Sequence, residues 1–168
     1  MQIRKLEVHD APAFHALRLR ALREHPAAFT SSFEEDAQLP VEASARRLDV
    51  TRNTFWGAFD ADGTLRGMVG LEREQRAKNR HKATVVAMYV AGECAGRGAG
   101  RALLQAVLQE ARAQGLELLV LTVTEGDGPA RHLYESVGFR SFGVEPRAIK
   151  VGAQAYAKNH MFLQLERA

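Results

Sequence analysis

The amino-acid sequence predicts an α/β fold built on a mixed sheet, and three observations lead to that prediction. Runs typical of strands alternate along the chain with amphipathic segments typical of helices. Residues 83–90 and 116–123 are nearly continuously apolar and flank a helical segment, an order that produces parallel neighbours through a right-handed crossover. The pair Asp62-Gly63 separates two further strand-like runs, which indicates an antiparallel hairpin.

The first half of the chain begins with an edge strand over residues 2–8, followed by a helix that Asp10 is expected to cap. This helix should end near His25-Pro26. It carries an apolar face made of Phe14, Leu17 and Ala21. Residues 27–38 are expected to form a loop, and Pro40 to open a short helix through about Leu48. The hairpin strands should then occupy residues 54–60 and 64–74.

The second half contains the two strands that we expect to be most deeply buried. Residues 83–90 should form a central strand, and the helix after the following glycine loop should end at Gly115. Its periodic apolar residues are Leu103, Leu104, Val107, Leu108 and Ala111. A last helix should start at Pro129, with its cap at Gly138 and Phe139. Its inward residues should be Ala130, Leu133 and Val137, and residues 142–165 should form a final pair of strands.

Composition narrows the classes of protein that remain. With 168 residues, 46% hydrophobic and 26% charged, the chain is expected to form one domain over residues 1–168. It contains neither an apolar run of about 20 residues nor a secretory signal, which favours a cytoplasmic protein without a membrane partner. Cys94 is the single cysteine, so no internal disulfide forms. The net charge of +3 is small and the basic residues are interleaved with acids, which argues against a nucleic-acid partner.

The segment 94-CAGRGAGR-101 places three alternating glycines directly before a helix. Its spacing does not fit the G-x-G-x-x-G of a dinucleotide site, and it has no lysine for a triphosphate P-loop. A helix N-terminus with unobstructed amides and with Arg97 and Arg101 suits a pyrophosphate. The loop alone leaves two interpretations open, a pyrophosphate cradle or an ordinary glycine-rich turn.

Two linked motifs resemble the GNAT-type N-acetyltransferase superfamily. The loop from Ala95 to Gly100 is similar to the family's [Q/R]-x-x-G-x-[G/A] pyrophosphate loop, with Ala95 in place of the leading Arg or Gln. The segment 127-DGPARHLYESVGF-139 resembles N-x-x-A-x-x-L-Y-x-x-x-G-F, with Asp127 in place of Asn. The resemblance implies a GNAT-type fold of about six to seven strands and about four helices. It also implies a cofactor core over about residues 84–139, with acetyl-CoA as cosubstrate.

The resemblance assigns a set of cofactor-binding residues. The strand end is similar to the family's pantetheine-pairing segment, where an N–H group could also stabilise a developing oxyanion. The residues assigned to the cofactor are Met88, Tyr89, Val90, Ala95, Gly96, Arg97, Gly98, Ala99, Gly100, Arg101, Asp127 and Ala130. No metal is expected, because the histidines lack ligand spacing and Cys94 has no partner cysteine.

The resemblance assigns the general acid, whereas residues 83–90 lack the central-strand glutamate that members of the family often use as the base, so a base is sought on the adjacent strand, on the face shared by Met68 and Gly70. Tyr134 matches the family's general-acid position, and a tyrosine with its ordinary pKa of about 10 can protonate a thiolate. Glu72 is the candidate general base, with relay through water as the competing account. The candidate substrate-binding residues are Phe29, Glu34 and Glu35, in a region that resembles the family's variable acceptor segment. Together with Asp36, these acids could attract a cationic amine, or they are simply solvated.

Three classes of function follow from these motifs. The first is an N-acetyltransferase that transfers acetyl from acetyl-CoA, by direct attack, to a primary amine of a small molecule or protein. The second is a non-catalytic module that senses CoA or acyl-CoA, and the third is an unrelated nucleotide-binding domain. Retention of Tyr134 favours the first. The sequence does not determine the acceptor amine, and it leaves a homodimer open.

Overall fold

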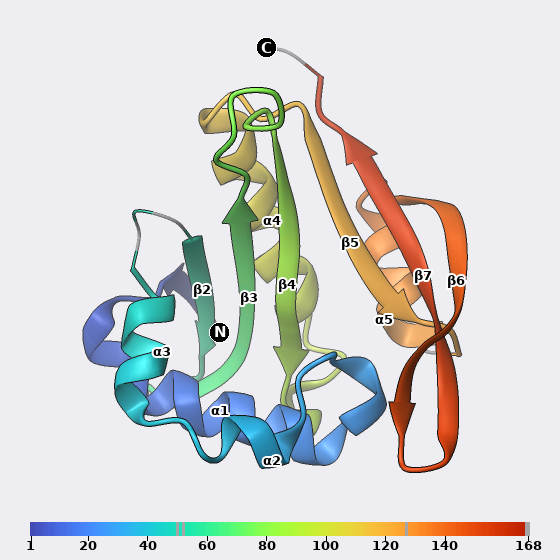
Figure 1. The fold of residues 1–168 in the computed structure, drawn as a ribbon. Helices are drawn as coiled ribbons and strands as arrows, with labels where there is room; N and C mark the ends of the chain where they lie inside the picture. Colours follow the sequence, from blue (N-terminus) through green and yellow to red (C-terminus); the bar gives the residue numbers. More distant parts are fainter. Residues whose placement is uncertain (50, 52, 127, 167–168) are drawn as a thin grey trace.

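Seven strands form one mixed sheet in the computed structural model, which describes residues 1–49, 51, 53–126 and 128–166 (Figure 1). The strands are β1 (Gln2–Lys5), β2 (Asn53–Phe59), β3 (Leu65–Arg73), β4 (Lys82–Val90), β5 (Leu118–Thr124), β6 (Arg140–Val151) and β7 (Gln154–Gln164). Their order across the sheet is β1-β2-β3-β4-β5-β7-β6. Strands β4 and β5 are parallel, and the other five described pairs are antiparallel. The predicted mixed sheet and its central strand are therefore confirmed.

Helices cover both faces of this sheet. They are α1 (Ala11–Glu24), α2 (Phe33–Asp36), α3 (Val41–Arg47), α4 (Ala99–Ala113) and α5 (Gly128–Ser136). In Figure 1, α4 and α5 lie behind the sheet, whereas α1, α2 and α3 lie in front of it. None of the helices in the described ranges combines the length and the apolar character that crossing a bilayer requires.

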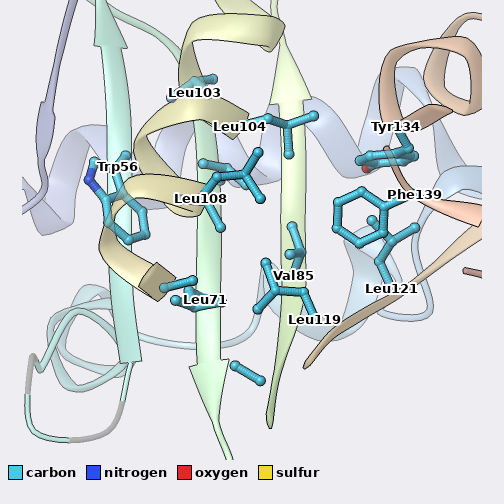
Figure 2. Close-up of a cluster of buried hydrophobic side chains, with 14 of the residues drawn as sticks. Trp56, Leu71, Val85, Leu103, Leu104, Leu108, Leu119, Leu121, Tyr134 and Phe139 are labelled. Carbon is cyan, nitrogen blue, oxygen red and sulfur yellow. The ribbon is translucent and has the colours of Figure 1, made fainter. Parts of the chain in front are cut away.

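The larger of the two buried clusters formed by the described residues lies under α4 and α5. Figure 2 shows Leu103, Leu104 and Leu108 of α4 packed over β2, β3 and β4. These leucines follow the helical periodicity predicted from the sequence, and Leu103 and Leu104 are fully buried. The second cluster joins α1 to the opposite face through Phe14, whose ring meets Phe55 edge-on. The sheet is therefore buried on both sides at its centre, as the apolar run in β4 predicted.

Two local predictions in the N-terminal part are wrong. Residues 27–38, expected to be a loop, contain helix α2, which a reciprocal capping box between Ser32 and Glu35 stabilises. Asp10 stands at the N-cap of α1, but its carboxylate does not cap that helix. It accepts hydrogen bonds from the Glu7 amide and from Arg4, because a 3₁₀ turn over Val8–Asp10 precedes the helix.

The C-terminal helix α5 presents Tyr134 as its buried residue. Ala130, Leu133 and Val137 are partly buried and pack against the larger cluster. Gly138 adopts a φ of +107°, and the Phe139 amide donates to the Tyr134 carbonyl at 3.1 Å. This is the predicted glycine cap, and it brings Phe139 back against the ring of Tyr134.

Strand β6 is the outer strand on the β7 side of the sheet. Phe142 and Val144 are 61% and 54% exposed on it. Its pairing with β7 shifts register between Glu145 and Ile149, and Arg147 has a φ of +54° there. The β6–β7 hairpin therefore bends where Pro146 and Arg147 interrupt the ladder.

Candidate functional site

The sheet opens between its two parallel strands. Strand β4 pairs with β5 only over Lys82–Thr84 in the part of the chain that the structure describes. Beyond Thr84 the two strands diverge toward their carboxyl ends, as Figure 1 shows, while β5 continues to pair with β7 through Thr124. The second half of β4 therefore turns one backbone edge toward an opening rather than toward a neighbouring strand. A crevice at the carboxyl ends of parallel strands is a common place for a ligand.

A bulge in β4 lies beside this opening. Met68 of β3 pairs with Tyr89, but Gly70 pairs with Val86, so one β3 residue faces two residues of β4. At the bulge, Ala87 adopts a φ of +55°. That left-handed conformation costs an ordinary residue roughly 1–2 kcal/mol, and such strain gathers at functional sites. The bulge re-aims the backbone of β4 at the opening.

Replacing Ala87 with glycine tests this conformation. Relief of the left-handed strain and the entropy of glycine nearly cancel, so we expect Ala87→Gly to change the free energy of unfolding by less than about 1 kcal/mol. Ala83, buried in the regular part of β4, is the matched control. Ala83→Gly should destabilise by about 1.5–2 kcal/mol, because it loses a buried methyl group as well. Urea unfolding compares the two, and equal losses would contradict a left-handed Ala87.

The glycine loop leads from β4 into helix α4. Gly96 and Gly98 have φ values of +74° and +77°, and a Cβ on either would meet no atom within 4 Å. The first intrahelical hydrogen bond runs from the Ala102 amide to the Gly98 carbonyl. The amides of the preceding turn therefore have no acceptor within the helix, and they carry the positive end of its dipole. Because Arg97 is exposed in the same loop, this end of α4 suits an anion.

An ion-pair network ties the start of this loop to the rest of the fold. Arg20 of α1 donates two hydrogen bonds to Glu93, at 2.8 and 2.7 Å, and Arg66 of β3 donates a third at 3.1 Å. The hydrogen bonds from Arg20 are the main cause that lowers the pKa of Glu93 to about 2. Glu93 belongs to the 3₁₀ turn Gly92–Cys94, so the network anchors the loop at its entrance.

A pocket of about 230 Å³ lies where the sheet opens. Residues of six elements and of the segment after α1 line it: Arg18, Ala28, Phe29, Thr30, Ser31, Arg47, Thr84, Val85, Val86, Ala87, Met88, Thr122, Tyr134 and Lys158. The bulge of β4 forms one wall and β5 supplies Thr122. The opening in the sheet therefore leads into a partly open pocket large enough for a small molecule.

Tyr134 reaches this pocket from α5. Its side chain is 6% exposed, and its ring centre lies 6.0 Å from that of Phe139, which Figure 2 shows beside it. The glycine cap of α5 positions both rings. A phenol held in this way in a pocket can donate a proton to a group bound there.

The structure brings most of the predicted cofactor residues to this end of the sheet. Met88 lines the pocket, and the loop from Ala95 to Arg101 follows directly after β4. Tyr89 turns its side chain to the opposite face, where its hydroxyl donates to Glu24 at 2.6 Å. Burial, and then this hydrogen bond, raise the pKa of Tyr89. Val90 ends β4, Ala130 packs on the cluster below α5, and Asp127 lies outside the described residues.

Most of the predicted acceptor-binding residues, and the predicted general base, lie outside the pocket lining. Phe29 lines the pocket, whereas Glu34 lines a neighbouring cavity and Glu35 takes part in the capping box of α2. Asp36 accepts a hydrogen bond from Arg18. Glu72 is not a lining residue, and its carboxylate lies 3.5 Å from Arg47. No group of three or more His, Cys, Asp or Glu in the described chain is arranged to hold a metal.

Sequence reasoning missed three cationic residues of the pocket, Arg18, Arg47 and Lys158. For Arg18, the sequence did contain a signal. It lies four residues after Phe14, within the apolar stripe of α1, where a charge is unexpected. Arg47 and Lys158 come from α3 and β7, and only the tertiary fold brings them to the pocket.

Comparison with known proteins identifies a family for most of the chain. Residues 16–139 match the model of the acetyltransferase (GNAT) family. The match spans the glycine loop, the opened strand and Tyr134. A search of curated proteins gave no match.

Solved structures share the whole fold. The GNAT-family acetyltransferase of Streptococcus pneumoniae is 24% identical with a TM-score of 0.89, covering 98% of this chain and 99% of its own. A GCN5-related N-acetyltransferase of Kribbella flavida is 28% identical with a TM-score of 0.82, covering 98% and 97%. The YncA structure of Salmonella typhimurium, solved with its cofactor acetyl-CoA, is 20% identical with a TM-score of 0.87, covering 100% and 95%.

Proposed function

The chain belongs to the acetyltransferase (GNAT) family, and from that membership we propose that it transfers the acetyl group of acetyl-CoA directly to a primary amine of a small molecule or protein. One observation carries the proposal. The opened edge of β4, its bulge and Tyr134 meet in a single pocket, and a Cβ on Gly100 of the glycine loop would lie 3.4 Å from Met88 in its wall. The acetyl-CoA held by the similar YncA structure supports the choice of donor.

The residues of the loop fit the pyrophosphate of this donor. Gly96 and Gly98 keep positive φ values and leave open space where a side chain would stand, so a ligand can approach the backbone closely. At Gly100 a side chain would instead be crowded by the protein, because a Cβ there would lie 3.0 Å from Leu133. The amides at the start of α4 would bind the phosphate oxygens, and Arg97 and Arg101 would add charge from the surface.

The chain's own groups would then guide the reaction in the pocket. Acetyl-CoA supplies an acetyl thioester whose carbonyl carbon an amine can attack. Backbone groups of Val86–Met88 on the β5 side of β4 would hold the arm of the cofactor, and an N–H group at the bulge would stabilise negative charge on the carbonyl oxygen. Tyr134 would donate its hydroxyl proton to the departing sulfur. Because the pocket is walled by α1, α3 and β7, it would hold the amine in line with these groups.

Release of CoA thiol in the presence of a panel of amines tests the proposal. The panel includes amino acids, diamines, aminoglycosides and peptides with free N-termini, each with saturating acetyl-CoA. We expect at least one class to release thiol above the rate of hydrolysis and to gain 42 mass units per transferred acetyl group. Calorimetric binding of CoA without turnover of any amine would contradict an enzyme and favour a sensor.

A further inference from the structure

The pocket is lined by cations from three separate elements. Arg18 comes from α1, Arg47 from α3 and Lys158 from β7. Among the described residues that line it, none is acidic. An anion placed inside about 230 Å³ lies within the field of all three. A second cationic group would be repelled from the same space.

Both arginines could donate further hydrogen bonds to a group bound in the pocket. Arg18 is 8% exposed, and it donates from Nε to Asp36 and from Nη2 to Ser31 at 2.9 Å. Arg47 lies over the Phe55 ring, with its Nη2 3.5 Å from Glu72. Burial lowers the pKa of Arg47, and the charge of Arg18 lowers it further. Two guanidinium groups that repel each other beside a pocket would both attract an oxyanion bound there.

Lys158 is the least compensated of the three. Its side chain is 5% exposed, and its one hydrogen bond to a described residue goes to the Ala28 carbonyl at 3.4 Å. No described carboxylate lies within ion-pair distance of Nζ. Burial lowers its pKa, since the charged form is poorly solvated, and the negative charge of Glu145 on β6 offsets this only in part. A buried ammonium group with one long hydrogen bond favours an anionic partner from outside the chain.

We propose that the acceptor amine carries a compact oxyanion, in the first instance a carboxylate, which Arg47 and Lys158 bind while the amine faces the Tyr134 end of the pocket. This inference rests on the proposed function, because it identifies the acceptor for the same site. The substrate class is therefore a small amino acid. A pocket of about 230 Å³ is below the range of sites for drug-sized ligands, and it suits such a molecule better than an aminoglycoside. A polyamine would bring a second cation toward three others.

The acidic residues after α1 agree with this assignment. Asp36 is engaged by Arg18, and Glu35 caps α2, so both carboxylates have structural partners. Asp36 orients one cation of the pocket, and Glu35 stabilises the short helix that follows the lining residues Ala28–Ser31. On this proposal the acceptor site would be basic rather than acidic, and exposed Glu34 lies in the neighbouring cavity instead.

Matched acids and amides test the proposal. The twenty L-amino acids and their α-carboxamides serve as acceptors with saturating acetyl-CoA, and 1,4-diaminobutane serves as a cationic comparison. For the best acid we expect kcat/KM at least tenfold above that of its amide. Arg47→Met and Lys158→Met should each bring this ratio close to one by raising the KM for the acid, with the KM for acetyl-CoA unchanged. Arg47→Lys, which keeps the charge, should retain part of the preference.

Arg46→Met is the matched control, because Arg46 is an exposed arginine on the same helix outside the pocket lining. It should leave the acid-to-amide ratio unchanged. Amides or the diamine reacting as well as the acids would overturn the inference and leave the acetyltransferase intact. Failure to bind CoA in calorimetry would overturn the proposed function instead.

A binding measurement tests the proposed acceptor site without requiring turnover. Protein saturated with CoA is titrated with the same acids and amides in a calorimeter. Tighter binding of acids in the wild type, lost in Lys158→Met, supports the site. Equal binding of acids and amides, or binding of neither, overturns it.

Discussion

Replacement of Tyr134 by phenylalanine is expected to lower kcat by roughly 10²–10⁴ while leaving CoA affinity nearly unchanged. The phenol lies in the pocket beside the bulge of β4, and its ring packs against Phe139. Phenylalanine keeps that packing and removes the hydroxyl proton that the departing sulfur would receive. The free energy of unfolding should change by no more than about 1.5 kcal/mol, the contribution of one hydrogen bond. Steady-state kinetics with the best acceptor and calorimetry with CoA measure the two effects.

Tyr156→Phe provides the control for this experiment. Tyr156 lies on β7 opposite Ile149, outside the pocket lining, and it loses the same hydroxyl group. Its kcat should match that of the wild type. A Tyr134→Phe enzyme with full kcat on the same acceptor would make Tyr134 a packing residue, and protonation of the thiolate would then fall to solvent.

Replacement of Gly98 by valine is expected to weaken CoA binding at least tenfold, about 1.4 kcal/mol. Gly98 is the N-cap of α4 with a φ of +77°, a conformation that a β-branched residue adopts only with strain. The side chain would also occupy the space through which a pyrophosphate approaches the amides of the first turn. A Cβ at this position meets no protein atom within 4 Å, so the fold should survive. Calorimetric titration of CoA gives the affinity.

The same helix supplies a control at its other end. Gly115 follows α4 with a φ of +68° and equally open surroundings. Gly115→Val should cost similar stability, roughly 1–2 kcal/mol, at a point about 22 Å from the loop. If both variants lose CoA affinity equally, general destabilisation rather than the cradle explains the loss. An unchanged affinity in a folded Gly98→Val protein would remove the loop from the binding site.

Local patterns were enough to predict most of the fold. The apolar run of β4, the leucine periodicity of α4 and the Gly138 cap of α5 each depend on residues close together in sequence, and all three are confirmed. Helix α2 was missed because its four residues are too few for apolar periodicity. The capping box of Ser32 and Glu35 was the available signal.

Only part of the candidate site could be predicted from the sequence, and the reason is physical. Glycines before a helix and Tyr134 in its motif are local signals, so the sequence could place the glycine loop after β4 and Tyr134 on α5. The bulge at Ala87 arises from the register between β3 and β4, which alanine itself does not encode. Lys158 reaches the pocket because β7 pairs with β5, a contact between strands distant in sequence. Cationic side chains that only the tertiary fold brings together cannot be predicted from local sequence motifs.

The bent outer strand β6 has a consequence for the behaviour of the protein at high concentration. A border strand with exposed Phe142 and Val144 offers unpaired backbone groups to any other extended chain. Pro146 withholds one of these donors, and the kink at Arg147 divides the twelve-residue strand into two short runs. Neither run is long enough to template an extended intermolecular ladder. Pro146 and Arg147 are therefore expected to limit aggregation through this edge, and any engineering of this hairpin has to preserve them.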